Sequence, residues 1–144
     1  MPKIIIHTDG GSRGNPGPAA LGVVIESASP KWKKEYGHYL GETTNNVAEY
    51  SAVVFALKKA KELLKSKASE TDVEVKADSE LIVRQMAGIY RVKNPGLKPL
   101  FAEVQALKSH FKSVTFAHVR REKNTEADAM VNIALDNKIK KTSI

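Results

Sequence analysis

The chain of 144 residues contains no cysteine, a single tryptophan and no long apolar run. Without cysteine it can form neither a disulfide nor a metal site with thiolate ligands, and a reducing interior suits it. Its first residues, MPKIIIHTDG, hold too short an apolar run for a signal peptide, and no later segment could span a bilayer. These absences predict a soluble, cytoplasmic protein that does not enter a membrane.

The composition predicts one domain with a real core and a basic surface. The length is that of a single domain, and 42% of the residues are hydrophobic. The net charge is +7 and the pI is about 9.6. An excess of positive charge favours polyanionic partners, nucleic acid above all, although a basic surface can also be a merely solvated one.

Hydrophobic periodicity predicts an α/β fold. Three apolar or alternating segments joined by turns precede a long amphipathic helix, and strands and helices then alternate. This order, βββαβα(α)βα, predicts a mixed sheet with helices on its faces. The expected strands are 4–8, 20–27, 35–41, 72–78 and 113–119, and the expected helices are 43–66, 79–88, 100–111 and 125–137. We expect residues 1–137 to form the domain and the basic segment 138–144 to be a flexible tail.

Four carboxylates occupy positions that suit a core poorly. Asp9 and Asp78 each follow a strand that reads as buried, and Glu49 extends the apolar stripe of the long helix. Asp128 falls in the first turn of the last helix. A buried carboxylate is costly unless it is paired or binds a metal, so these acids are candidate metal ligands.

Each acid also has a purely structural interpretation. Asn46 could cap its helix with Glu49 as the returning carboxylate, and Thr125 with Asp128 fits the same capping pattern. Asp78 before Ser79 could belong to an ordinary helix start, and Asp9 could be a turn residue. Spacing alone does not show that the four acids meet.

The stretch HTDGGSRGNPG, residues 7–17, concentrates glycine behind one acid. It lacks the Gly-Lys-Ser/Thr ending of a P-loop, and a strand follows it where a Rossmann site requires a helix. What remains is either a hairpin loop with Gly-Asn-Pro-Gly turn chemistry or a backbone segment that approaches a ligand closely.

Four segments, in this order, resemble type 1 ribonuclease H. They are TDGGSRGNPGPAALGVVIES, TTNNVAEYSAVVFAL, ADSELIVRQMAGIYRVKNPGLKPL and HVRREKNTEADAMVNIAL, and together they run from about residue 4 to residue 135. The resemblance implies the ribonuclease H-like fold, a five-stranded mixed sheet whose second strand is antiparallel. It also implies an endoribonuclease that hydrolyses the RNA strand of RNA–DNA hybrids and leaves 5′-phosphate and 3′-hydroxyl ends.

By this resemblance the active-site acids are Asp9, Glu49, Asp78 and Asp128, which would bind two Mg²⁺ ions, or Mn²⁺ in their place. Mg²⁺ prefers hard oxygen ligands, and two ions about 4 Å apart can clamp the attacking and leaving oxygens of a phosphodiester. The family pattern gives Asp9 to both ions and Asp128 to the ion that activates water. Glu49 and Asp78 would hold the ion beside the leaving 3′-oxygen.

The resemblance further implies contacts to the substrate. The 2′-hydroxyl distinguishes RNA from DNA, and backbone near the glycines could sense it. The expected contact residues are Gly10, Gly11, Ser12, Asn15, Asn45, Asn46 and Ser79.

The sequence departs from the family pattern in two places. The loop before the last aspartate is short, so we assign His118 to a strand and Arg121 to the catalytic site; an arginine can hold phosphate but is not a neutral base. The connector GIYRVKNPGLKP is too small for the basic, tryptophan-rich protrusion of many relatives, which leaves Arg91, Lys93 and Lys98 as candidate phosphate contacts.

Two other classes of function compete with a hybrid nuclease. A binding module could keep the basic face without catalysis, but clustered acids near phosphate would weaken it. Another metal-dependent nuclease could use the same fold, because one fold hosts many functions. We expect an RNA–DNA hybrid as partner, double-stranded RNA as a further candidate, and a monomeric protein.

Overall fold

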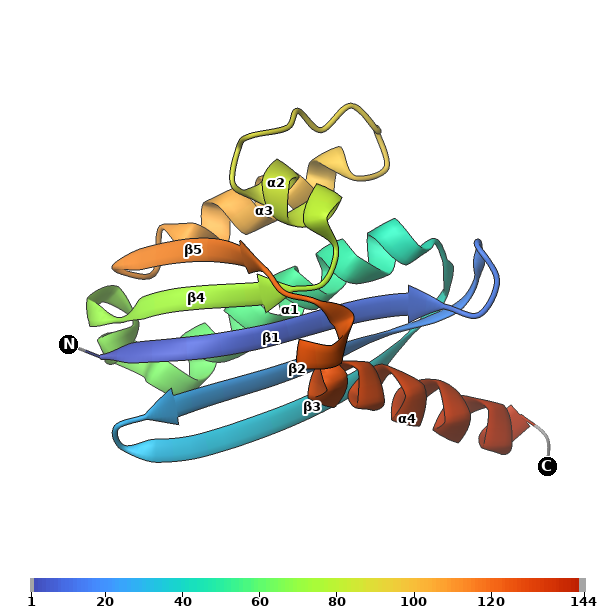
Figure 1. Cartoon of the computed structure of the whole chain (residues 1–144), viewed down its shortest axis with the longest axis horizontal. Helices are drawn as coiled ribbons and strands as arrows, with labels where there is room; N and C mark the ends of the chain where they lie inside the picture. Colours follow the sequence, from blue (N-terminus) through green and yellow to red (C-terminus); the bar gives the residue numbers. More distant parts are fainter. Residues whose placement is uncertain (1, 143–144) are drawn as a thin grey trace.

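The computed structural model describes residues 2–142, which form one five-stranded sheet with helices on both faces (Figure 1). The strands are β1 (Lys3–Ser12), β2 (Gly17–Ala28), β3 (Lys31–Thr43), β4 (Asp72–Ala77) and β5 (Ser113–His118). The helices are α1 (Asn45–Leu64), α2 (Glu80–Met86), α3 (Lys98–Lys108) and α4 (Thr125–Thr142), with short 3₁₀ helices η1 (Lys65–Glu70) and η2 (Arg121–Lys123).

The sheet is mixed, as the element order predicts. Its strand order is β3-β2-β1-β4-β5. The first three strands form an antiparallel meander, whereas β4 and β5 run parallel to β1. The expectation of an α/β fold with a five-stranded mixed sheet and an antiparallel second strand is therefore confirmed.

Successive residues of β1 face the helices on opposite sides of the sheet. A Cβ built on Gly10 would lie 2.3 Å from the backbone carbon of Ala48 in α1, whereas one on Gly11 would lie 3.8 Å from Val131 in α4. Glycine also admits α4 to the sheet, because a Cβ on Gly22 would lie 2.0 Å from the carbonyl oxygen of Ala127. Two helix starts are thereby held close to the end of β1.

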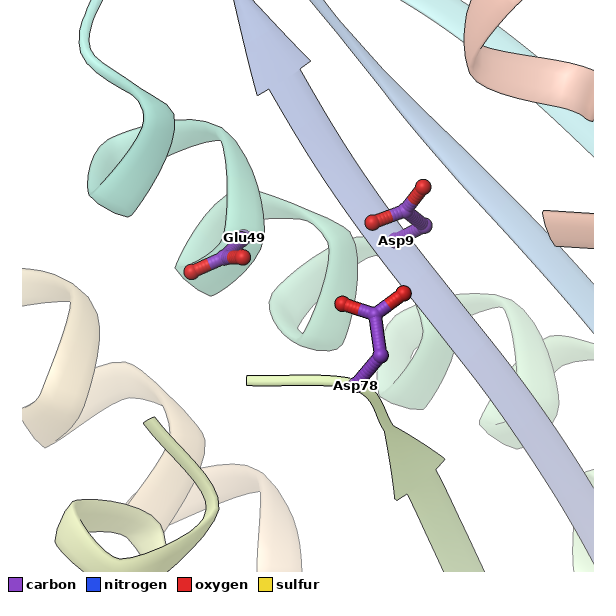
Figure 2. A group of neighbouring side chains, drawn as sticks. All are labelled: Asp9, Glu49 and Asp78. Atoms are coloured by element: carbon purple, nitrogen blue, oxygen red, sulfur yellow. The ribbon is translucent and has the colours of Figure 1, made fainter. Parts of the chain in front are cut away.

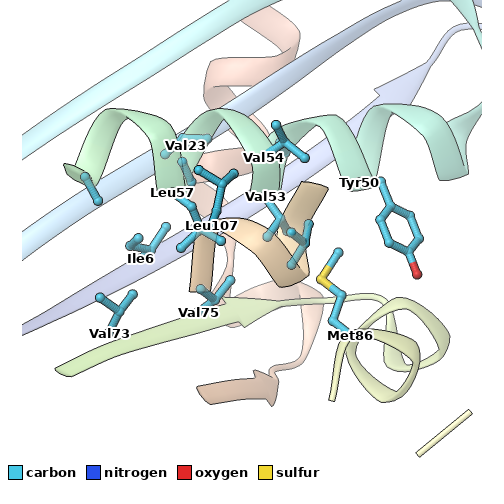
Figure 3. Packing of buried hydrophobic residues seen from close by; sticks show 14 of the residues in the cluster. Ile6, Val23, Tyr50, Val53, Val54, Leu57, Val73, Val75, Met86 and Leu107 are labelled. Carbon is cyan, nitrogen blue, oxygen red and sulfur yellow. The ribbon is translucent and has the colours of Figure 1, made fainter. Parts of the chain in front are cut away.

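The main core lies between the sheet and α1, with α2 and α3 closing it (Figure 3). Alternate β1 residues, including Ile6, point into it, and Val53 and Leu57 form the apolar stripe of α1. Leu57 is fully buried, so its truncation to alanine is expected to cost about 2–5 kcal/mol of stability. This core makes α1 and the sheet a rigid base for groups at its edge.

The first three strands are longer than local pattern predicts, whereas β4 and β5 each end one residue earlier than expected. β1 continues through Ser12 and β2 begins at Gly17, because the antiparallel pairing extends as far as Ser12 with Ala19. The glycine stretch is thus mostly strand, and its loop is only 13–16. β3 begins at Lys31, within the expected 28–34 turn, for the same reason.

The ends of two helices also differ from expectation. Thr44, and not Asn46, caps α1, since its side chain accepts a hydrogen bond from the Val47 N–H at 3.2 Å. Helix α4 runs on to Thr142, into the segment expected to be a tail, because no glycine or proline follows residue 137 to end it. Residues 143–144 lie outside the described residues, and the mobility of the tail stays a prediction.

Within residues 2–142, none of the helices combines the length and the apolar character needed to cross a membrane.

Candidate active site

Three carboxylates from three elements converge at one edge of the sheet (Figure 2). Asp9 lies on β1, Glu49 on α1, and Asp78 immediately follows β4. One oxygen of each lies within 4.8 Å of one oxygen of the other two. All three side chains are partly buried, so the group forms a compact acidic site and not a scattered set of surface charges.

Strand pairing explains why Asp9 and Asp78 meet. β1 and β4 are parallel neighbours, and their last pair is Thr8 with Ala77. An aspartate follows each of these two residues in the sequence, so both carboxylates lie at the same edge of the sheet. Glu49 joins them because Gly10 lets the first turns of α1 pack against β1: a Cβ there would lie 2.4 Å from the Glu49 nitrogen.

Asp128 lies on the far side of Asp9, in the first turn of α4. Its carboxyl lies close enough to Asp9 to raise the pKa of that side chain. The close approach of α4 to Gly22 of β2 determines its place. The structure therefore brings the fourth predicted acid to Asp9, although the compact three-carboxylate group does not include it.

Burial and mutual repulsion make ionisation of the carboxyl groups at this site unfavourable. Burial, followed by the charges of Asp78 and Asp128, raises the pKa of Asp9 from 3.8 to about 8. Burial and then Asp78 raise the pKa of Glu49 from 4.5 to about 7, against smaller opposing effects of Ser79 and Arg121. Neighbouring like charges that cannot all ionise freely are the arrangement that a bound cation relieves.

Ser79 links the acidic group to the start of α2. Its side chain lowers the pKa of Glu49, and its hydroxyl accepts a hydrogen bond from the Ile82 N–H at 3.4 Å, which caps the helix. Ser79, and not Asp78, is therefore the residue that caps α2, and it also influences one of the acids.

A hydrogen-bonded corner joins the glycine stretch to α1. The backbone N–H of Ser12 donates to Asn45 Oδ1 at 2.8 Å, and the Ser12 hydroxyl donates to the same oxygen at 3.1 Å. The Asn45 N–H donates to Asn15 Oδ1 at 3.1 Å. These bonds hold the end of β1 and the start of α1 in one orientation beside the acids.

One cleft of about 360 Å³ contains nearly every predicted catalytic and substrate-contact residue, but not the candidate phosphate contacts Arg91, Lys93 and Lys98. Of the predicted residues it is lined by Asp9, Gly10, Gly11, Ser12, Asn45, Asn46, Glu49, Asp78, Ser79, Arg121 and Asp128. Asn15 is not among its lining residues and supports Asn45 from outside. The sequence did not suggest four further lining residues, Arg13, Val131, Asn132 and Leu135.

Two of these additional residues contact charged partners. Arg13 forms a salt bridge to Asp136 at 2.7 Å, and Asn132 donates to the Asp128 carboxylate at 3.4 Å. Asn132 follows Asp128 by one helical turn, so its place beside that acid could have been read from the spacing. The Arg13–Asp136 pair joins distant parts of the chain and leaves no local pattern.

Arg121 and His118, the two candidates for a basic catalytic residue, lie in different places. Arg121 lies in η2 at the mouth of the cleft and lowers the pKa of Glu49, whereas His118 ends β5, outside the cleft lining, as the strand interpretation predicts. The connector after α2 exposes Ile89 and Tyr90, and the Tyr90 ring lies under the Arg84 guanidinium at 5.5 Å.

Two larger hollows, of about 760 and 890 Å³, flank Trp32 at the opposite end of the sheet. Their acids are Glu70 in one and Glu26 in the other, amid several lysines. Size alone would favour them, but neither gathers carboxylates that could hold a cation, so the smaller cleft is the candidate active site.

Residues 7–134 match the model of a protein family described as Reverse transcriptase-like. The bifunctional protein Rv2228c of Mycobacterium tuberculosis is 42% identical over 135 residues, which cover 93% of this chain and 36% of that protein. Ribonuclease HI of Halobacterium salinarum is 36% identical over 135 residues, covering 94% of this chain and 65% of the relative. The chain thus spans between about a third and two thirds of the length of these curated relatives.

Solved structures match over nearly their full length. The structure of LC11-RNase H1, isolated from compost by a metagenomic approach, is 50% identical with a TM-score of 0.89, covering 96% of this chain and 99% of the other. The same protein in complex with an RNA/DNA hybrid is matched at 48% identity and a TM-score of 0.87, covering 94% and 99% of the two chains.

Proposed function

This chain belongs to the ribonuclease H family, and we propose that it is an endoribonuclease that hydrolyses the RNA strand of RNA–DNA hybrids. The observation that carries the proposal is the convergence of Asp9, Glu49 and Asp78, with oxygens within 4.8 Å, in a cleft that Asp128 also lines. The likeness to LC11-RNase H1, which binds an RNA/DNA hybrid, supports the choice of substrate.

The donor set fits hard divalent cations. All four groups are carboxylates, which Mg²⁺ and Mn²⁺ prefer over nitrogen or sulfur ligands. The raised pKa values of Asp9 and Glu49 add that ionisation of the group is unfavourable without positive charge nearby. When bound, two such ions would supply an activated water and offset the charge that develops on the phosphate oxygens.

The position of each of the four acids suggests which metal ion it would bind. Asp9 belongs to the three-carboxylate group with Glu49 and Asp78, and it is also close enough to Asp128 for that carboxyl to raise its pKa. We therefore assign Asp9 to both ions and Asp128 to the ion on the side of the attacking water. The remaining pair, Glu49 and Asp78, would serve the ion beside the leaving 3′-oxygen, so that the products carry 5′-phosphate and 3′-hydroxyl ends.

The corner made by Ser12 and Asn45 is the part of the cleft suited to a ribose-bearing strand. The backbone of Gly10 and Gly11 lines the cleft there, so a sugar can approach it closely, and Asn46 is exposed beside it. Sensing of a 2′-hydroxyl by such polar groups would distinguish RNA from DNA. Asn15 contributes by holding Asn45 in place.

Arg121 would hold a phosphate at the mouth of the cleft. Its guanidinium is permanently charged and suits a phosphate oxygen, but it offers no neutral base. Its proposed share of catalysis is therefore smaller than that of the acids. All of these groups come from one chain, so a monomer suffices for activity.

A single cleavage panel tests the proposal. RNA–DNA hybrid, single-stranded RNA, double-stranded RNA and duplex DNA are each incubated with Mg²⁺, Mn²⁺ or a chelator, and the ends of the products are mapped. We expect cleavage of the RNA strand of the hybrid with either metal and none with the chelator. Cleavage that persists in the chelator, or a preference for duplex DNA, would refute the proposal.

Two variants assign the activity to this site. Asp78→Asn removes one acid of the group, and Asp72→Asn makes the same change at the opposite end of β4, where the side chain accepts from the Ser113 hydroxyl at 2.6 Å. We expect the first variant to lose cleavage and the second to retain it. Binding of the hybrid without cleavage by the unmodified protein would instead favour the binding module.

A further inference from the structure

Asn124, just before α4, is a buried polar residue with an unusual set of contacts. It is 1% exposed. Its side-chain amide nitrogen donates to the carbonyl oxygen of Thr8 at 2.8 Å and to Asp78 Oδ2 at 3.2 Å. Its Oδ1 has no hydrogen-bond partner in the part of the chain that the structure describes.

The chemistry of the neighbours determines the orientation of this amide. A backbone carbonyl and a carboxylate are both acceptors, so the nitrogen, with its two hydrogens, must face them. Turning the amide around would place its oxygen against two other oxygens. The side chain therefore keeps both donors in use and leaves its oxygen unpaired among the described residues, which lowers stability.

These contacts join three segments that carry acids of the site. Thr8 immediately precedes Asp9 on β1, and the second bond reaches Asp78 itself. The backbone carbonyl of Asn124 accepts from the Asp128 N–H at 3.1 Å, which begins α4. One residue thus links the segments of three of the four carboxylates, which come from distant parts of the chain.

We propose that Asn124 is a positioning residue that holds the Asp78 carboxylate and the end of β1 in the arrangement that binds the metal ions. The proposal rests on the proposed function but assigns Asn124 a part in metal binding that its burial alone does not imply. An amide with an unpaired buried oxygen is a poor choice for packing, whereas two donors aimed at two acceptors suit the orientation of a ligand.

Other side chains do not reproduce this arrangement. Aspartate has nearly the same shape but places an acceptor against two acceptors, and alanine removes both bonds. Serine keeps one donor on a shorter side chain. Leaving the Asp78 carboxylate without its bond would allow it other rotamers and loosen the ligand set.

The test compares Asn124→Ala with Thr71→Val. Thr71 is also fully buried and lies far from the cleft. Its replacement by valine removes a single side-chain hydrogen bond, which the hydroxyl donates to the Lys67 carbonyl at 2.7 Å. Binding of Mn²⁺ without substrate is measured for both variants by titration, at a temperature where circular dichroism shows each to be folded. Kinetics on the hybrid then give kcat and KM separately.

We expect Asn124→Ala to bind Mn²⁺ about tenfold more weakly and to lower kcat by about 10–100-fold with little change in KM, in the range of losses at residues that orient metal ligands. Thr71→Val should stay within twofold of the unmodified protein in both. If Asn124→Ala does not fold, Asn124→Ser is measured in its place. Its Mn²⁺ affinity and kcat should lie between the values expected for Asn124→Ala and those of Thr71→Val.

Metal binding and kcat within twofold of the unmodified protein, in a folded Asn124 variant, would overturn the proposal. So would an equal loss in Thr71→Val, since that loss would reflect stability alone. If the unmodified protein binds Mn²⁺ but cleaves no hybrid, the proposed function fails, while the metal titrations still decide the role of Asn124.

Discussion

Replacing Asp78 by asparagine is expected to abolish cleavage and, at alkaline pH, to make the metal-free protein more stable. Burial and then the charge of Asp78 raise the pKa of both Asp9 and Glu49. The substitution removes that charge but keeps a side-chain oxygen that can accept from Asn124. Asp78 would therefore be required for cleavage although its charge lowers the stability of the metal-free protein.

The distances set the size of the effect. Two unit charges 4.8 Å apart repel by about 1 kcal/mol in water and about 3 kcal/mol at an effective dielectric constant near 20. The three side chains are partly buried, so the gain should lie between these limits. For a domain of this length, 1–3 kcal/mol corresponds to a rise in Tm of about 3–9 °C.

The gain must depend on pH in a definite direction. Asp9 has a pKa of 3.8 as an ordinary aspartate and about 8 in the fold, so between these values the folded state binds more protons than the unfolded state. The free energy of unfolding of the metal-free protein therefore falls as pH rises through that window. Glu49 adds to the fall between 4.5 and about 7. Asp78→Asn should flatten this dependence, with little effect near pH 4.

The assay is thermal unfolding in a chelator at pH 4, 6.5 and 9, for the unmodified protein, Asp78→Asn and the control Asp72→Asn. Added Mg²⁺ should raise the Tm of the unmodified protein more than that of Asp78→Asn, because binding to the folded state stabilises it. A Tm of Asp78→Asn that is no higher than that of the unmodified protein at pH 9, or a gain equally large at pH 4, would refute the electrostatic reasoning.

Three further outcomes follow from the site. Gly10→Ala should destabilise the protein by about 3 kcal/mol or more in a denaturant titration, because its Cβ would overlap the backbone of Ala48, whereas Gly11→Ala should change stability by less than about 1 kcal/mol. Arg121→Ala should lower kcat/KM about tenfold, which is less than the loss of any of the four acids would cause. Arg120 is an exposed arginine on the same loop, and Arg120→Ala should leave kcat/KM unchanged. Equal effects of the two substitutions would contradict the assignment of Arg121. Raising the salt concentration from 50 to 200 mM should weaken hybrid binding in the presence of metal, measured by fluorescence anisotropy, and a salt-independent affinity would argue against phosphate contacts.

The sequence alone was enough to predict the fold and the four acids that the structure brings to one cleft. Periodicity distinguishes strand from helix locally, so the order of the elements and the strand ends before Asp9 and Asp78 could be read directly. The four motifs then brought Glu49, Asp128 and the asparagines of the cleft into one family pattern. Where local pattern failed, at the ends of β1, β2 and β3, the length of a strand depended on its partner.

Tertiary structure alone decided how the acids meet and what that does to them. Gly10 reads locally as a loop residue, but the structure shows that it makes room for α1 and so delivers Glu49 to Asp9. Asn124 belongs to one of the segments that resemble the family, but the sequence does not reveal that its side chain contacts β1 and Asp78. Hydrogen bonds, burial and pKa values depend on distances between residues far apart in the chain, and these distances exist only once the sheet and its helices have packed together.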